Sequence, residues 1–146
     1  MRFYRNGLII LTAVLLITLF SGCSESKPTE VIAGPEYAGA ITEEILLALN
    51  TGDYAVYTKN FDEAMEKAMQ EPVFSQMREF FQKKIGLYES KKISKVEVGD
   101  VYTTVVYKAK FSDEPKDVTV TIVFLETEDK VLVSGLWFDS PKLREQ

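Results

Sequence analysis

The sequence contains no histidine and a single cysteine, Cys23, among its 146 residues. The lack of histidine excludes Ser-His and Cys-His nucleophile pairs, histidine-ligated zinc or haem, and the usual general base near neutral pH. A lone cysteine cannot form a disulfide within the chain, so packing alone has to stabilise the fold. Any catalysis would depend on carboxylate, tyrosine or lysine side chains, and we expect neither a cofactor nor a metal site.

The sequence also lacks an apolar run long enough to remain as a transmembrane helix. Its longest run covers residues 8–20, whereas a helix needs about 20 residues to span a bilayer. Two arginines precede the run, and the small residues Ser21 and Gly22 follow it. A basic start, a short apolar stretch and a small-residue cleavage site are the parts of an export signal, so we predict a signal peptide over residues 1–22.

Cys23 stands directly after this segment. The stretch Leu19-Phe20-Ser21-Gly22-Cys23 resembles the lipobox of prokaryotic lipoproteins, in which the cysteine receives a diacylglyceryl group and becomes the new N-terminus. The resemblance implies a lipoprotein that is anchored in the membrane through Cys23 and faces outside the cytoplasm, and two acyl chains suffice for stable anchoring. The alternative is that Cys23 is an ordinary residue of a signal peptide that is cut elsewhere.

The remaining chain divides into two parts. Residues 23–36 mix serine, proline, glycine and charge without periodicity, which predicts a lipidated N-terminus and a flexible tether. Residues 37–146 contain no second linker and no repeat, so they predict one domain. Because the formal net charge is −5 and no basic face is evident, we expect no nucleic acid partner.

Helical periodicity dominates the first half of this domain and strand periodicity the second. Aspartates and glycines stand where helices would begin or end, and the predicted helices cover residues 36–50, 54–59, 63–70 and 72–85. After Gly86 the apolar period changes to two residues, and the predicted strands cover residues 92–98, 101–111, 118–124 and 131–139. Short turns join the strands, so we predict an α+β fold in which N-terminal helices pack on a four-stranded antiparallel sheet.

Two segments carry a resemblance to a known superfamily. The cap Leu49-Asn50-Thr51-Gly52-Asp53-Tyr54 and the closing strand VLVSGLWF over residues 131–138 resemble those of the nuclear transport factor 2-like (SnoaL-like) superfamily. In particular, they are similar to small prokaryotic lipoproteins that contain such a domain of unknown function. The resemblance covers about residues 36–139 and implies a curved sheet wrapped around a helix, a cystatin-like cone with a pocket. Members include isomerases, dehydratases, transport factors and structural partner domains, so the fold does not specify a function.

Four aromatic side chains are candidates for the wall of an apolar ligand pocket, because concave sites are usually rich in aromatic residues. They are Tyr57, Phe81, Tyr107 and Trp137. The alternative is that Trp137 and Phe81 are core residues. Asp139, at the end of the last strand, is the best candidate for a general base, and a solvated carboxylate at a strand end is the alternative.

The other charged groups fit structural roles. Acidic groupings at residues 43–44, 62–66 and 126–129 lack the glycine-punctuated alternation of a calcium loop and are explained by helix starts and turns. Lys91, Lys92 and Lys95 form a small basic cluster, which we interpret as a solvated face.

Three functions remain open. The first is an extracytoplasmic binding or interaction module for a small apolar ligand or an envelope protein. The second is a structural or homodimerisation module, for which the strand face with Tyr102, Thr104 and Val106 offers partly apolar surface. The third is a small isomerase, dehydratase or hydrolase based on aspartate and tyrosine, which would require a buried carboxylate within hydrogen-bond reach of a tyrosine that faces a cavity.

Overall fold

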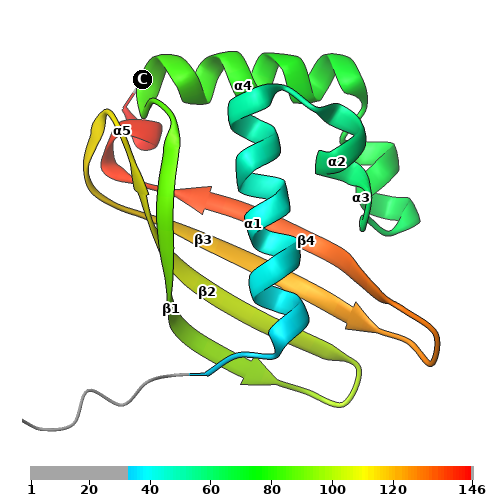
Figure 1. The fold of residues 1–146 in the computed structure, drawn as a ribbon. Helices are drawn as coiled ribbons and strands as arrows, with labels where there is room; N and C mark the ends of the chain where they lie inside the picture. The colour runs from blue at the N-terminus through cyan, green and yellow to red at the C-terminus, as the bar shows by residue number, and fades with distance from the viewer. Residues whose placement is uncertain (1–32, 146) are drawn as a thin grey trace, which may run out of the picture. The chain divides into compact units, whose positions relative to one another are not determined.

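The computed structural model of the protein describes residues 33–145 (Figure 1). The predicted signal peptide, the predicted lipidation of Cys23 with its cleavage residues Ser21 and Gly22, and most of the predicted tether lie outside the described residues. Among the helices of residues 33–145, none is long and apolar enough to cross a membrane.

Helices come first in the described chain and strands follow, with one short helix at the end. The helices are α1 (Glu36–Thr51), α2 (Tyr54–Thr58), α3 (Glu63–Ala68), α4 (Glu71–Lys84) and α5 (Pro141–Arg144). The strands are β1 (Tyr88–Val98), β2 (Tyr102–Phe111), β3 (Glu114–Glu126) and β4 (Val131–Asp139). They pair antiparallel in the order β1-β2-β3-β4 and form an open sheet. The prediction of an α+β fold with N-terminal helices and a four-stranded antiparallel sheet is therefore confirmed.

Local sequence signals set the ends of the first helices. α1 ends at Gly52, whose φ of 81° suits glycine and whose N–H donates to the carbonyl of Ala48. Asp53 and Asp62 begin α2 and α3, because each carboxylate accepts a backbone N–H of the first helical turn. The predicted boundaries of these helices lie within roughly two residues of the observed ones, since the caps can be recognised without knowledge of the tertiary structure.

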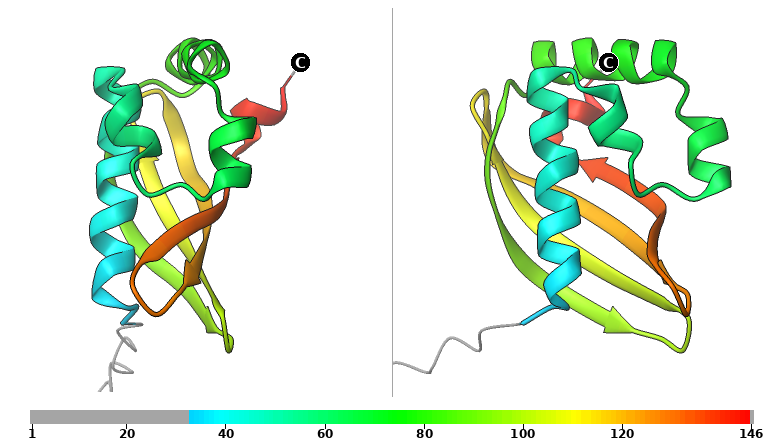
Figure 2. Two further views of the ribbon diagram at one scale, coloured as in Figure 1. Left: turned by 90° about the vertical axis from the view of Figure 1, so that its right-hand side faces the viewer. Right: turned by 45° about the vertical axis from the view of Figure 1, so that its right-hand side comes forward.

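The sheet has one buried and one uncovered face. In β2 and β3, buried side chains alternate with half-buried or exposed ones. We call the buried side the inner face, and α1 lies along it (Figures 1 and 2). The inner face of these two strands carries Val105, Tyr107, Ala109, Phe111, Val118, Val120, Ile122 and Phe124. We call the opposite side the outer face.

Aromatic side chains hold the helices together and against β4. Tyr57 of α2 is fully buried, and its ring centroid lies 4.6 Å from that of Phe74 in α4. Phe81, further along α4, packs against Phe138 of β4 with ring centroids 4.8 Å apart. Truncation of a buried aromatic side chain to alanine typically costs about 3–5 kcal/mol, so these contacts contribute much of the stability.

Arg78 joins α4 to the end of α1. Its Nε donates to the carbonyl of Leu49 over 2.9 Å, and its Nη2 donates to the carbonyl of Asn50 over 3.0 Å. The last carbonyls of a helix have no partner within the helix and carry partial negative charge. Because the last turn of α1 contains no basic residue of its own, a guanidinium from another helix supplies the missing donors.

β1 is longer than predicted and irregular. It begins at Tyr88 rather than at residue 92, and shifts in its register against β2 mark two β-bulges, at Glu89 and at Ser94. Each bulge leaves one residue of β1 without a partner in β2 and changes which side chains reach each face. The start was missed because residues 88–91 show no simple apolar alternation.

Other differences from the sequence predictions lie near the C-terminus. β3 begins at Glu114, inside a predicted turn, because Glu114 pairs with Phe111 and is buried. Its carboxylate accepts the N–H of Lys142, which fixes the start of the unpredicted α5. The interpretation of Trp137 as a core residue is wrong: it is 57% exposed, because the adjacent Phe138 occupies the inner face.

Candidate functional site

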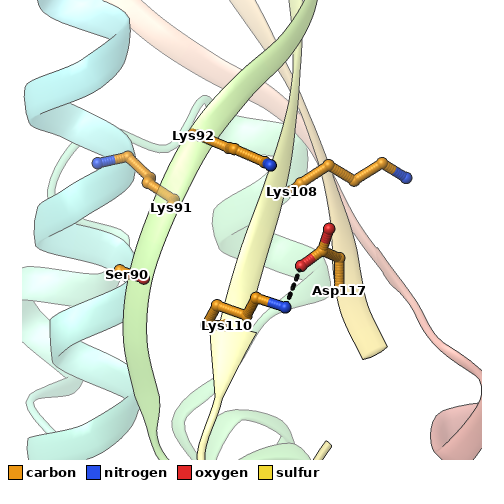
Figure 3. Close-up of a pocket in the computed structure, with 6 residues that line it drawn as sticks. All are labelled: Ser90, Lys91, Lys92, Lys108, Lys110 and Asp117. Carbon is orange, nitrogen blue, oxygen red and sulfur yellow. Dashed lines mark ion pairs between the residues drawn. The ribbon is translucent and has the colours of Figure 1, made fainter. Parts of the chain in front are cut away.

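The outer face of the sheet contains a hollow lined by lysines (Figure 3). Its volume is about 210 Å³, and it lies over the paired parts of β1, β2 and β3. The lining residues are Ser90, Lys91, Lys92, Lys108, Lys110 and Asp117. We call this site the lysine hollow.

Strand register brings these lysines together. Lys92 of β1 lies directly opposite Lys108 of β2, and Ser90 lies opposite Lys110. Side chains at directly opposed positions of an antiparallel pair are about 5 Å apart, and like charges there are destabilising. The bulge at Glu89 contributes to this register, because it places Ser90 rather than Glu89 opposite Lys110. The fold thus accepts an unfavourable charge arrangement at this place.

One carboxylate partly compensates this positive charge. Lys110 Nζ lies 2.7 Å from Asp117 Oδ1, and this contact, strengthened by the charges of Lys92 and Lys108, holds the pKa of Asp117 below its usual value. Lys108 donates to the hydroxyl of Thr119 over 2.8 Å. Within residues 33–145, neither Lys92 nor Lys108 forms an ion pair, so the hollow keeps an excess of positive charge that an anionic ligand can neutralise.

Lys91 belongs to a different cluster although it lines the same hollow. Figure 3 shows its side chain directed toward α1, away from the other lysines, and its Nζ donates to Glu43 of that helix. Glu43 also accepts the hydroxyl of Tyr88 over 2.8 Å. Burial alone would raise the pKa of Glu43, but the hydrogen bonds from Lys91 and Tyr88 outweigh it and lower that pKa.

An enzyme of this kind would require a carboxylate–tyrosine pair, and the described residues contain two such hydrogen bonds: Tyr88 to Glu43, and Tyr37 to the exposed Glu126. Glu43 is 42% exposed and is neutralised by Lys91. A carboxylate with a lowered pKa is a weak base, and burial raises the pKa of Tyr88, which keeps its proton. The arrangement therefore fastens α1 to β1 and offers no activated acid or base.

Trp137 lies on the outer face, as does the lysine hollow. It pairs with Thr121 of β3, whereas Lys108 pairs with Thr119, the next outward-facing residue of the same strand. Its indole lies next to Gly135, where a Cβ would stand 2.2 Å from the ring. Glycine at position 135 is therefore what allows the ring to lie against β4.

The four predicted pocket residues do not come together. Tyr57, Phe81 and Tyr107 are buried in the core, and Trp137 lies on the other side of the sheet. Asp139, the candidate base, is exposed and lies 3.1 Å from Arg144 Nε in an ion pair. Within residues 33–145, no group of three or more acidic residues is arranged to hold a metal ion.

Sequence reasoning found only one edge of the lysine hollow. It noted Lys91, Lys92 and Lys95 as a cluster, but it gave Lys108 and Lys110 no role. Lys108 and Lys110 are two residues apart, so they lie on the same face of their strand. This spacing indicates a lysine cluster once β1 and β2 are known to pair. The register that opposes Lys92 to Lys108 depends on the bulges, and these have no clear sequence signature.

These observations define a class: a small α+β domain whose helices cover one face of an antiparallel meander, with a lysine-lined hollow on the other face. The chain belongs to the family described as "Protein of unknown function (DUF3887)", which matches residues 42–134. The matched region includes the whole lysine hollow and ends before Trp137. A search of curated proteins gave no match.

Proposed function

We propose that this protein is a membrane-anchored lipoprotein whose extracytoplasmic domain binds an anionic ligand in the lysine hollow. The observation that carries the proposal is that Lys92, Lys108 and Lys110 line one hollow in which Asp117 is the only carboxylate among the lining residues. Ammonium groups attract phosphate and carboxylate as point charges, and their attraction increases in a partly enclosed site. The ligand class is therefore an anion with phosphate or carboxylate groups.

The proposal places the ligand outside the cone that a nuclear transport factor 2-like fold would enclose. We propose that fold for the domain, because α1 lies along the inner face of a twisted meander (Figure 2). The inner space is filled by core side chains, among them Tyr57, Tyr107 and Phe124, each with an exposed fraction of at most 1%. A ligand of any size fits the uncovered face better than this packed interior.

Anchoring is tested at the predicted lipidation site. Cys23→Ser removes the thiol that would carry the diacylglyceryl group, so we expect an uncut precursor without lipid. Ser24→Ala, one position further on, serves as the matched control and should still be processed. Mass spectrometry of the protein extracted from membranes measures both outcomes. Recovery of the same mature, detergent-partitioning species from Cys23→Ser would contradict the lipid anchor.

Anion binding is tested by calorimetric titration with pyrophosphate and with citrate. We expect binding that weakens as salt is added, because screening reduces attraction between charges. Lys108→Gln should weaken it by roughly tenfold, the equivalent of one charge-assisted contact. Lys67→Gln, which removes an exposed lysine of α3, is the control of equal charge and should bind as the wild type does. Equal affinities of the two variants would contradict the assignment of the hollow.

A second candidate function, homodimerisation through the outer face, is supported by one observation. Tyr102 is 52% exposed on this face, and Trp137 is also exposed there. Two exposed aromatic residues on one sheet face offer apolar area for a second copy. Sedimentation analysis distinguishes the two functions, because a dimer would form without any added anion.

A further inference from the structure

We infer that the outer face is a binding surface for an anionic polysaccharide, with Trp137 stacking on a sugar ring and the lysine hollow holding the negative groups of the chain. This inference rests on the proposed function and extends it, because it names the kind of molecule that carries the negative groups. It depends on the position of Trp137, which anion binding alone does not explain.

Trp137 is an exposed aromatic residue of the outer face. Its indole lies on the backbone at Gly135, and any side chain at that position would displace it. More than half of its surface is exposed, although indole is among the most costly groups to leave in water. An exposed aromatic side chain offers a surface against which the apolar C–H side of a pyranose ring can pack.

The surface between Trp137 and the lysine hollow carries two threonines, and it is bordered by Asp139, which forms an ion pair with Arg144. Thr121 faces Trp137 across β3 and β4, and Thr119 holds Lys108 by a hydrogen bond. Across the sheet, Trp137 and Lys108 are separated by two strand spacings, or roughly 10 Å. Along the strands they are separated by two residues, or roughly 7 Å. This separation exceeds one sugar ring, so a ligand that engages both ends has to be a chain. Threonine hydroxyls can both donate and accept hydrogen bonds with sugar hydroxyls on the way.

The balance of charge favours a polysaccharide over a nucleic acid. The chain as a whole carries a net charge of −5, and two carboxylates, Asp117 and Asp139, lie on or beside the same face. Nucleic acid presents a charge on every nucleotide and needs a broad positive surface. A sugar polymer with spaced carboxylates or phosphates needs only a local cluster of cations, which the lysine hollow provides.

The test uses the full-length protein in detergent and partly methyl-esterified polygalacturonate, called polygalacturonate below, in which neutral rings separate the charged ones. Trp137 is the only tryptophan in the chain, so the intrinsic tryptophan fluorescence reports on this site alone. We expect polygalacturonate to change the emission and to bind more tightly than monomeric galacturonate. Its fully methyl-esterified form, which has the same sugar rings without charge, should bind at least roughly tenfold more weakly, since it cannot engage the lysines.

Variants separate the two ends of the surface. Trp137→Ala should weaken binding of polygalacturonate by roughly tenfold in calorimetry and leave binding of pyrophosphate unchanged, whereas Lys108→Gln should weaken both. Gly135→Ala should act as Trp137→Ala does, because it displaces the indole. Tyr102→Ala, which removes another exposed aromatic residue of the outer face, is the matched control and should bind the polymer normally.

The following results would overturn the inference. Unchanged binding of polygalacturonate by Trp137→Ala, or no binding by the wild type, would exclude the polymer while leaving the pyrophosphate result to decide the proposed function. Tighter binding of oligothymidylate than of polygalacturonate would identify the surface as a nucleic acid site. A change of Trp137 emission with protein concentration alone would assign the surface to a second copy of the chain.

Discussion

Aromatic residues of this protein serve two different purposes, which their surroundings distinguish. Tyr57 and Phe74 pack against each other between helices and are almost completely buried. Trp137 lies against Gly135 on the opposite side of the sheet and contributes no such contact with the core. An aromatic residue therefore cannot be assigned to the core from its type alone, because its neighbours in the structure decide whether it is buried.

Truncation of these residues should therefore have unequal effects on stability. We expect Trp137→Ala to lower the free energy of unfolding by less than about 1 kcal/mol, as exposed positions usually do. Phe74→Ala should lower it by about 3–5 kcal/mol, because it leaves a cavity between α2 and α4. Urea unfolding followed by circular dichroism measures both. A large loss in Trp137→Ala would mean that the indole supports the core.

The carboxylate of Glu43 should make stability depend on pH. Its pKa is lower in the folded protein than in the unfolded chain, because Lys91 and Tyr88 stabilise the charged form. The unfolded chain therefore binds a proton more readily, so this contribution is complete above the ordinary pKa of 4.5 and is lost as the pH falls through the folded value. The urea midpoints of wild type and Glu43→Gln should differ more at pH 7 than at pH 3. Equal differences at the two pH values would contradict this role.

Helix ends are the clearest feature at the scale of the elements. The junction between α1 and α4 depends on Arg78, whose planar guanidinium reaches two carbonyls of α1 at once. Lysine carries the same charge but has no such fork of donors. The contact therefore combines charge with geometry.

Substitution of Arg78 separates these two contributions. Arg78→Ala should lower the free energy of unfolding by about 1–3 kcal/mol, because it leaves the carbonyls of Leu49 and Asn50 without their donors. Arg78→Lys should recover only part of this loss. Hydrogen exchange at the last turn of α1 should rise in the same order. Full recovery by lysine would show that charge alone matters.

The sequence predicted the elements better than it predicted the site. Helix caps such as Gly52 and Asp62 act within a few residues, so they can be recognised locally. The start of β3 at Glu114 could not be recognised locally, because that residue is buried through contacts with α5. The lysine hollow depends on pairing between strands and on bulges, which are long-range features. The sequence analysis therefore proposed a pocket of aromatic residues, chosen by residue type. It missed the lysines of the hollow, because the register of the strands brings them together.

At the scale of the whole molecule, the core extends from α1 to the end of β4. Ala38, near the start of α1, is fully buried, and Phe138 packs against Phe81. Both residues lie outside the segment that matches the family, residues 42–134. The structural unit is therefore larger than the matched segment.

Two fragments test this boundary. A fragment of residues 33–145 should unfold in a single cooperative transition, since it contains every residue of the described core. A fragment of residues 42–134 lacks Ala38 and Phe138 and should be less stable by several kcal/mol, or should not fold. Calorimetry and circular dichroism measure both. Equal stability of the two fragments would confine the core to the matched segment.

The bulges of β1 have a consequence for crowded copies of this protein. β1 is an edge strand, and a long, regular edge is a template on which further chains add by backbone pairing. The interruptions at Glu89 and Ser94, together with Lys91, Lys92 and Lys95 along the strand, make such a template poor. The irregularity that sets the register of the lysine hollow therefore also disfavours the pairing of a second copy with this edge, even where many copies lie close together.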